Sequence, residues 1–107
     1  MSTIEAKKIA KQYANVLRKH RVAFNQMFLF GSHAKGRAKK HSDIDIAVVV
    51  KQIGQGEKYL DKKMRLWELV PEVDVRIEPI LLEKKDFQKG MATALALEVQ
   101  KHGIRVI

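Results

Sequence analysis

Residues 43–50 constrain the fold more than any other part of the chain, because their side chains divide into two unlike sets. The segment reads Asp-Ile-Asp-Ile-Ala-Val-Val-Val. Successive side chains of a β-strand point to opposite faces of its sheet. One face of this strand is therefore purely aliphatic, while the other begins with Asp43 and Asp45. The segment predicts a strand whose aliphatic face is covered by other elements and whose opposite face carries two carboxylates at one end.

The rest of the chain carries the helix and strand patterns of an α/β (α+β) domain. Apolar residues recur at helical intervals after a Ser2–Glu5 capping box, which predicts a helix over 3–20. Leu60, Met64 and Trp67 form the apolar stripe of a second helix, which we expect to be core or interface. The second helix is expected to end before Pro71. The other expected elements are strands over 27–30, 73–79 and 104–107 and a last helix that ends at His102. Together they predict a small mixed sheet flanked by helices.

Length and charge limit the organisation and the partners. The 107 residues are the size of one domain, which we expect to span 1–107. Twenty-one Lys and Arg against twelve Asp and Glu leave a net charge of +9, which favours a nucleotide, a nucleic acid or an acidic protein as partner. The absence of cysteine excludes disulfides, thiolate metal sites and a cysteine nucleophile.

Hydropathy predicts no contact with a membrane. The longest unbroken apolar run, residues 46–50, is far shorter than the roughly 20 residues that span a bilayer. The N-terminal residues contain no hydrophobic signal segment. We therefore expect a cytoplasmic protein.

The turn between the strands at 27–30 and 43–50 excludes three familiar ligand motifs. Gly31 and Gly36 have the spacing of a P-loop, but that motif needs Lys followed by Ser or Thr where Arg37 and Ala38 stand. A dinucleotide-binding fingerprint needs glycine at position 33, which is histidine. A calcium loop that starts at Asp43 lacks its required glycine. The four histidines have no metal-ligand spacing and are expected at the surface.

Asp43 and Asp45 remain as candidates to bind a metal ion. Residues i and i+2 of a strand lie about 6.6 Å apart, so both carboxylates can face one cation or a pair of cations. Asp74 can join them from a neighbouring strand. Three crowded carboxylates repel one another unless a hard divalent ion compensates their charge. Magnesium is the expected ion, because it is commonly held by a few carboxylates together with substrate phosphates.

Gly31-Ser32, ten further residues and Asp43-x-Asp45 together resemble the signature of the DNA polymerase β-like nucleotidyltransferases. The run GSHAKGRAKKHSDIDIAVVV is most similar to their minimal, single-domain branch, the MNT proteins. The resemblance implies a polymerase β-like fold. It also implies magnesium-dependent transfer of a nucleoside monophosphate, expected to be AMP from ATP, to an acceptor hydroxyl.

The resemblance also implies roles for individual residues. Asp43, Asp45 and Asp74 would hold the metal, expected as two Mg²⁺ ions, and Asp74 would also help to deprotonate the acceptor. The residues expected to bind the phosphates of the nucleoside triphosphate are Gly31, Ser32, Lys35 and Arg37.

MNT proteins commonly act as antitoxins paired with HEPN-domain toxins, and some of them modify the toxin by adding AMP. The resemblance therefore implies a HEPN-type toxin, or a second copy of the chain, as protein partner. Nucleic acid stays open as a partner but is not favoured. The alternative is a basic binding module with an idle catalytic site, which neutralises a toxin or binds nucleic acid.

Overall fold

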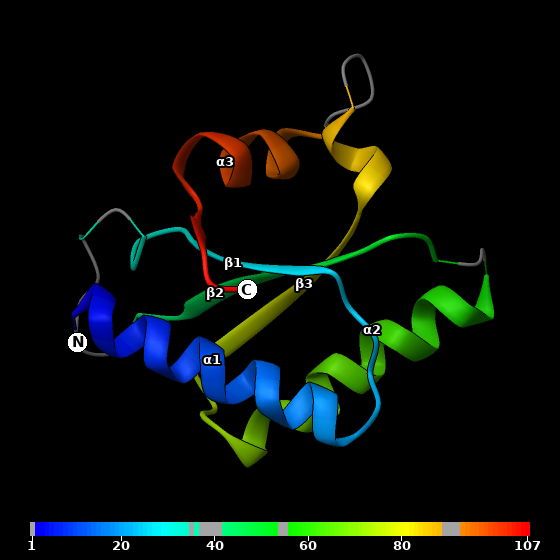
Figure 1. Ribbon diagram of the computed structural model, residues 1–107, viewed down its shortest axis with the longest axis horizontal. Helices are drawn as coiled ribbons and strands as arrows, with labels where there is room; N and C mark the ends of the chain where they lie inside the picture. Colours follow the sequence, from blue (N-terminus) through cyan, green and yellow to red (C-terminus); the bar gives the residue numbers. More distant parts are fainter. Residues whose placement is uncertain (1, 35, 37–41, 54–55, 89–92) are drawn as a thin grey trace.

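Figure 1 shows the computed structural model, which describes residues 2–34, 36, 42–53, 56–88 and 93–107. Its elements are α1 (Thr3–Lys19), β1 (Gln26–Phe30), β2 (Ile44–Val50), α2 (Glu57–Leu69), η1 (Val70–Glu72), β3 (Ile77–Glu83), η2 (Lys84–Phe87), α3 (Ala94–His102) and β4 (Ile104–Arg105). The strands form one sheet in the order β3-β2-β1-β4. β1 is antiparallel to β2 and to β4, whereas β2 and β3 are parallel. The expected mixed sheet with flanking helices is confirmed.

Two hydrophobic layers follow from the alternation along β2. Ile44, Ile46, Val48 and Val50 belong to a core that includes buried residues of α1 and α2. Ala47 and Val49 point the other way, into a smaller core that contains Val99 of α3. Figure 1 accordingly shows α1 and α2 on one side of the sheet and α3 on the other. The smaller core covers only part of its face, and the two aspartates lie at the uncovered end of β2.

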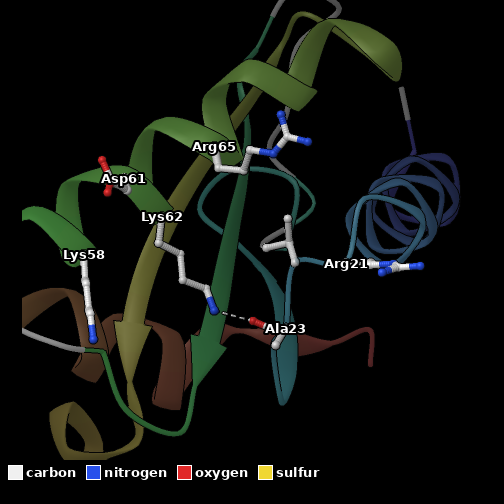
Figure 2. A pocket seen from close by; sticks show the side chains of 7 residues that line it. Arg21, Ala23, Lys58, Asp61, Lys62 and Arg65 are labelled. Atoms are coloured by element: carbon white, nitrogen blue, oxygen red, sulfur yellow. Dashed lines mark hydrogen bonds between the residues drawn. The ribbon is translucent and has the colours of Figure 1, made fainter.

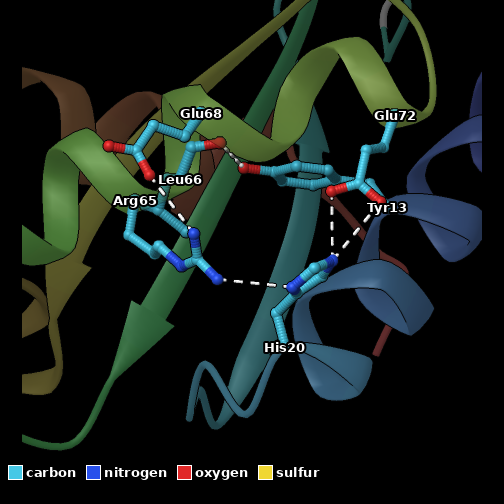
Figure 3. Close-up of polar contacts among 6 residues, drawn as sticks. All are labelled: Tyr13, His20, Arg65, Leu66, Glu68 and Glu72. Carbon is cyan, nitrogen blue, oxygen red and sulfur yellow. Dashed lines mark hydrogen bonds and ion pairs between the residues drawn. The ribbon is translucent and has the colours of Figure 1, made fainter.

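α1 begins where the sequence predicted. Ser2 caps the helix, because its hydroxyl accepts a hydrogen bond of 3.2 Å from the Glu5 backbone N–H. The buried face of α1 consists of Ala6, Ala10, Tyr13, Ala14 and Leu17. The three alanines allow close packing on the sheet. Tyr13 then donates a hydrogen bond of 2.7 Å to the Leu66 carbonyl oxygen of α2 (Figure 3). Burial raises the pKa of the Tyr13 phenol above its usual value, so this donor stays protonated.

The strand predicted over 73–79 was placed wrongly, since β3 spans 77–83. Pro79 was expected to end the strand, yet it pairs in register with Ile46. The Ile77 N–H bonds outside the sheet, to the Asp74 carbonyl oxygen at 3.2 Å. Side chains and backbone groups alternate along a strand, so the nitrogen of Pro79 also points away from β2. A proline is tolerated there because β3 is an edge strand and loses no ladder hydrogen bond.

The apolar stripe of the second helix points outward. Leu60, Met64 and Trp67 are 57%, 59% and 45% exposed, whereas α2 packs on the core through Leu66 and Leu69. The stripe was assigned to core or interface, and the structure excludes the core. The last helix, α3, ends at His102 as predicted and starts at Ala94 after a Thr93 cap. None of the described helices is long and apolar enough to cross a membrane.

We predict that Tyr13→Phe lowers the free energy of unfolding by about 1 kcal/mol, because the hydrogen bond to the Leu66 carbonyl is lost in a buried site. Urea denaturation monitored by circular dichroism measures this change. Tyr59→Phe is the matched control, since the Tyr59 side chain is 38% exposed. Equal stability of the Tyr13 variant and the wild type would show that this bond does not hold α1 against α2.

Candidate active site

The neighbours of β2 bring three chain segments together at its first residues. In the parallel pairing with β3, Asp45 lies opposite Glu78. On the other side of β2, Asp45 lies opposite Phe30, the last residue of β1. Paired strands are about 4.8 Å apart, so side chains on one face at these positions touch. Asp45 is therefore flanked by a second carboxylate on one side and by the turn after β1 on the other.

The glycine turn lies directly against the Asp45 carboxylate. Gly31 has φ = 71°, a left-handed conformation that favours glycine. A Cβ added at Gly31 would overlap the Oδ2 atom of Asp45. Ser32 follows in the same turn and is half-buried. The other two residues expected to bind phosphate, Lys35 and Arg37, lie outside the described residues.

Three carboxylates interact at this end of the sheet: Asp43, Asp45 and Glu78. Burial raises the pKa of Asp45, and the negative charge of Asp43 raises it further, while a hydrogen bond with Glu78 acts in the opposite direction. Burial also raises the pKa of Glu78, as do the charges of Asp43 and Asp45. Asp45 and Glu78 therefore retain their protons more tightly than isolated carboxyl groups would.

Asp74 was expected to join Asp43 and Asp45, and the structure pairs it with Arg76 instead. Asp74 lies in the turn before β3, where its carboxylate accepts hydrogen bonds from the Arg76 backbone N–H at 2.9 Å and the guanidinium at 3.0 and 2.6 Å. These hydrogen bonds lower the pKa of Asp74. The third carboxylate of the cluster is instead Glu78. Its position was obscured because the strand was predicted over 73–79, and only the true register of β3 places Glu78 beside Asp45.

His33 lies inside the protein rather than at its surface. Its side chain is 1% exposed, and its Nε2 atom is 3.4 Å from the Ser42 carbonyl oxygen. Its own carbonyl oxygen accepts a hydrogen bond of 2.8 Å from the Thr3 hydroxyl. His33 thus connects the glycine turn both to the start of α1 and to the residue before Asp43. The expectation of a surface histidine was wrong here, because polarity alone did not reveal that α1 covers this turn.

The chemistry of the carboxylate cluster suits a hard divalent cation. Asp45 and Glu78 have raised pKa values, and together with Asp43 they offer carboxylate oxygens whose mutual repulsion a cation would compensate. Within the described part of the chain, no three His, Cys, Asp or Glu side chains are already arranged around a common metal position. The side chains of Asp43, Asp45 and Glu78 would therefore have to rearrange around a cation when one binds.

Comparison with known proteins identifies the family. Residues 7–106 match the family model described as polymerase beta, nucleotidyltransferase. The chain therefore belongs to the polymerase β nucleotidyltransferase family, and it is a nucleotidyltransferase. It is 26% identical over 106 residues to a Methanocaldococcus jannaschii protein named "Putative protein adenylyltransferase MJ0141", covering 99% of this chain and 100% of that protein. A second protein of the same organism and type, MJ1305, is 34% identical over 62 residues, which cover 56% of this chain and only 42% of the relative.

Solved structures share the fold at low sequence identity. One is described as a putative nucleotidyltransferase from Sulfolobus solfataricus, with a TM-score of 0.63, 22% identity, and coverage of 98% of this chain and 86% of the other. Another is a toxin-antitoxin complex with AMP-PNP, with a TM-score of 0.61, 21% identity and coverage of 92% and 72%. A third is a tri-AMPylated Shewanella oneidensis HEPN toxin in complex with an MNT antitoxin, with a TM-score of 0.56, 19% identity and coverage of 95% and 71%. These likenesses confirm the polymerase β-like fold.

We predict that Glu78→Gln stabilises the metal-free protein at neutral pH, whereas Asp74→Asn destabilises it. A carboxyl with a raised pKa in the folded state contributes stability at low pH and loses that contribution as the pH rises through the folded-state pKa, and Gln avoids this loss. Asp74 has a lowered pKa, so its contribution is present at neutral pH and is lost as the pH falls.

Urea unfolding of both variants at neutral and acidic pH, with chelator present, measures these opposite effects. At a pH low enough to protonate all carboxyl groups, the two variants should approach the wild type. A Glu78 variant that is less stable than wild type at neutral pH would contradict the carboxylate cluster.

Proposed function

We propose that this protein is a magnesium-dependent adenylyltransferase that transfers AMP from ATP to a hydroxyl group of a protein. Asp43, Asp45 and Glu78 bind the metal in this proposal, and Gly31 and Ser32 bind the β- and γ-phosphates. Mg²⁺ bound by these carboxylates would neutralise the negative charge of the phosphates. The names of the two Methanocaldococcus jannaschii relatives support the choice of AMP and of a protein acceptor.

The single observation that carries this proposal is the contact of the Gly31 backbone with the Asp45 carboxylate. A phosphate bound along the glycine turn lies beside the metal-binding carboxylates only if no side chain separates the two. The absence of a Cβ at Gly31 leaves that space. Alignment and charge neutralisation account for most of the catalysis of phosphoryl transfer, so a site of this kind needs no side-chain nucleophile.

The proposed reaction is a displacement at the α-phosphorus of ATP. The acceptor hydroxyl oxygen forms a bond to the α-phosphorus of ATP, the bond from that phosphorus to the bridging oxygen breaks, and pyrophosphate leaves. The hydroxyl proton needs a base nearby. We assign this role to Glu78 in place of Asp74, because Glu78 lies opposite Asp45 in the β2–β3 pairing, whereas the Asp74 carboxylate is occupied by Arg76.

We predict that Asp45→Asn and Glu78→Gln each reduce the transfer of label from α-labelled ATP by at least about a hundredfold, because each removes part of the charge that aligns the phosphates. Asp74→Asn is the matched control, since it removes the same charge outside the cluster and should retain transfer once corrected for the folded fraction. Loss of transfer in the Asp74 variant with full activity in the Glu78 variant would reverse the assignment. Undiminished transfer in both the Asp45→Asn and the Glu78→Gln variants would refute the proposed site.

The glycine contact provides a second arm of the same experiment. Gly31→Ala and Gly56→Ala both place an alanine at a positive φ, since the two glycines have φ angles of 71° and 73°. Only the methyl group at position 31 meets Asp45, whereas nothing lies within 4 Å of one at position 56. Transfer should therefore be lost in the first variant and kept in the second. Equal activities would show that the close approach is not needed.

We further propose that the physiological acceptor and partner is a HEPN-type toxin, for which this protein acts as the antitoxin. The solved structures described above as toxin-antitoxin complexes support this role. The outward face of α2 also supports a protein partner, since Leu60, Met64 and Trp67 form an exposed apolar row. Exposed apolar patches of this kind commonly mark protein interfaces. A binding module with an idle site would use the same face, and the transfer assay distinguishes it from an enzyme.

We predict that Met64→Glu weakens the complex with a HEPN-type toxin at least about tenfold, because a buried interface tolerates an unpaired charge poorly. Isothermal titration calorimetry with the purified pair measures the affinity. Val75→Glu is the control, since Val75 is 79% exposed and lies outside α2. Equal affinities of the two variants would exclude the apolar row from the interface, and the absence of any complex would exclude the antitoxin role.

A further inference from the structure

The residue that follows the C-cap of α1 has a backbone conformation that its side chain does not favour. The Val22 N–H bonds to the Leu17 carbonyl oxygen at 2.8 Å and the Arg21 N–H to that of Arg18 at 3.0 Å. These bonds form a Schellman motif, in which the residue after the C-cap is left-handed and is usually glycine. Here that residue is Arg21, with φ = 60°, and no other described non-glycine residue has a positive φ. Helix termination therefore does not account for an arginine at this position.

Arg21 lines a basic cleft of about 490 Å³ between the α1–β1 turn and α2. The basic cleft is lined by Arg21, Val22, Ala23, Lys58, Asp61, Lys62 and Arg65. Figure 2 shows Lys58, Lys62 and Arg65 extending from α2, while Arg21 lies on the turn across from that helix with its side chain extending away from it. Four positive charges thus surround one negative charge. Asn25, which precedes β1, bonds to the carbonyl oxygen of Val49 near the end of β2, so the cleft and the carboxylates lie at opposite ends of the sheet.

Two of the four cations are held in place by the fold. Lys62 donates a hydrogen bond of 2.6 Å to the Ala23 carbonyl oxygen across the cleft (Figure 2). Arg65 contacts Glu68 at 3.2 Å and His20 at 3.3 Å, and His20 in turn contacts Glu72 at 3.0 Å (Figure 3). Cations whose positions are fixed before binding lose less conformational entropy when they meet a ligand.

The other two cations, Arg21 and Lys58, are available to a ligand. Both side chains are exposed, and neither forms an ion pair with a side chain that the structure describes. Lys58, Lys62 and Arg65 follow one another at i, i+4 and i+7, which aligns them along one side of α2 over about 10 Å. The cleft therefore presents a row of positive charge on α2, and the exposed side chain of Arg21 lies at its edge on the α1–β1 turn.

The lining of the cleft distinguishes among anionic ligands. A protein partner would need a central apolar or aromatic anchor, but only Val22 and Ala23 are apolar here. The apolar row of α2 is offset by two residues from the basic row. This offset corresponds to a rotation of about 200° around the helix axis, so the two rows lie on different sides of α2. Among the residues that the structure describes, no aromatic side chain lines the cleft, so these residues offer no surface for base stacking. What remains is contact with phosphate groups, which Arg and Lys bind without regard to base sequence.

We propose that this basic cleft binds the phosphate backbone of a nucleic-acid strand. Each of the four cations contacts phosphate oxygens, and the left-handed arginine is retained for that contact although glycine would suit the turn better. Binding here does not depend on the transferase activity, because it uses neither the carboxylates nor the glycine turn. The nucleic acid is held at the end of the sheet opposite the proposed active site.

The test measures binding of a fluorescently labelled uridine oligonucleotide by anisotropy over a series of salt concentrations. A chelator is present, so that the metal-free carboxylates repel phosphate and the active site does not contribute. The cleft variant is Arg21→Gly with Lys58→Gln. The control variant is Lys8→Gln with Lys11→Gln, which removes the same charge from exposed positions on α1.

For single strands, the slope of the logarithm of the binding constant against the logarithm of the salt concentration becomes shallower by about 0.7 for each phosphate contact that is lost. The slope should therefore decrease by about 1.4 in the cleft variant and by much less in the control variant. Arg21→Gly alone should raise the urea midpoint while it weakens binding, since it relieves the left-handed strain. This pairing of higher stability with lower affinity separates a ligand role from a structural role for Arg21.

Four results would overturn the proposal. They are no measurable binding of the oligonucleotide, equal losses in the cleft and control variants, displacement of the oligonucleotide by polyglutamate at equal charge concentration, and saturable binding of inorganic tripolyphosphate without binding of the oligonucleotide. The third result would indicate an acidic protein as ligand, and the fourth would indicate a free phosphate compound.

Discussion

The structure depends on the burial of one face of β2. Ile44, Ile46, Val48 and Val50 are almost completely inaccessible to water beneath α1 and α2, and this hydrophobic contact fixes the orientation of every other side chain of the strand. A shift of one residue would turn these four side chains toward α3 and Asp45 into the core. The position of Asp45 on the open part of the opposite face thus follows from the packing of its neighbours.

The same constraint determines which acid completes the carboxylate cluster. Once β2 is fixed, its parallel pairing with β3 places Glu78 next to Asp45. Pro79 reinforces this arrangement, because it fits only where its nitrogen faces away from β2. The cluster has a price in stability, since burial and mutual repulsion raise the pKa values of Asp45 and Glu78. Such strain is common at sites whose charge is compensated only by a ligand.

α2 carries two different surfaces on one short helix. Its apolar row is exposed and points away from the sheet, whereas its basic row borders the cleft beside the α1–β1 turn. Leu66 and Leu69 anchor the helix in the core, and the hydrogen bond from Tyr13 to the Leu66 carbonyl oxygen holds it against α1. A small domain can therefore support a protein partner on one side and a polyanion on another, while its carboxylates lie at the far end of the sheet.

The amino-acid sequence by itself determined the elements with a strong local period and both halves of the motif, Gly31-Ser32 and Asp43-x-Asp45. Helix capping, side-chain alternation and glycine turns are local properties, so α1, β1 and β2 were predicted nearly to the residue. Only the tertiary structure decided that Glu78 rather than Asp74 joins the aspartates, that α2 exposes its apolar row, and that His33 is buried. These features depend on which strand pairs with β2 and which helix face meets the sheet, and contacts between distant segments leave no periodic pattern in the sequence.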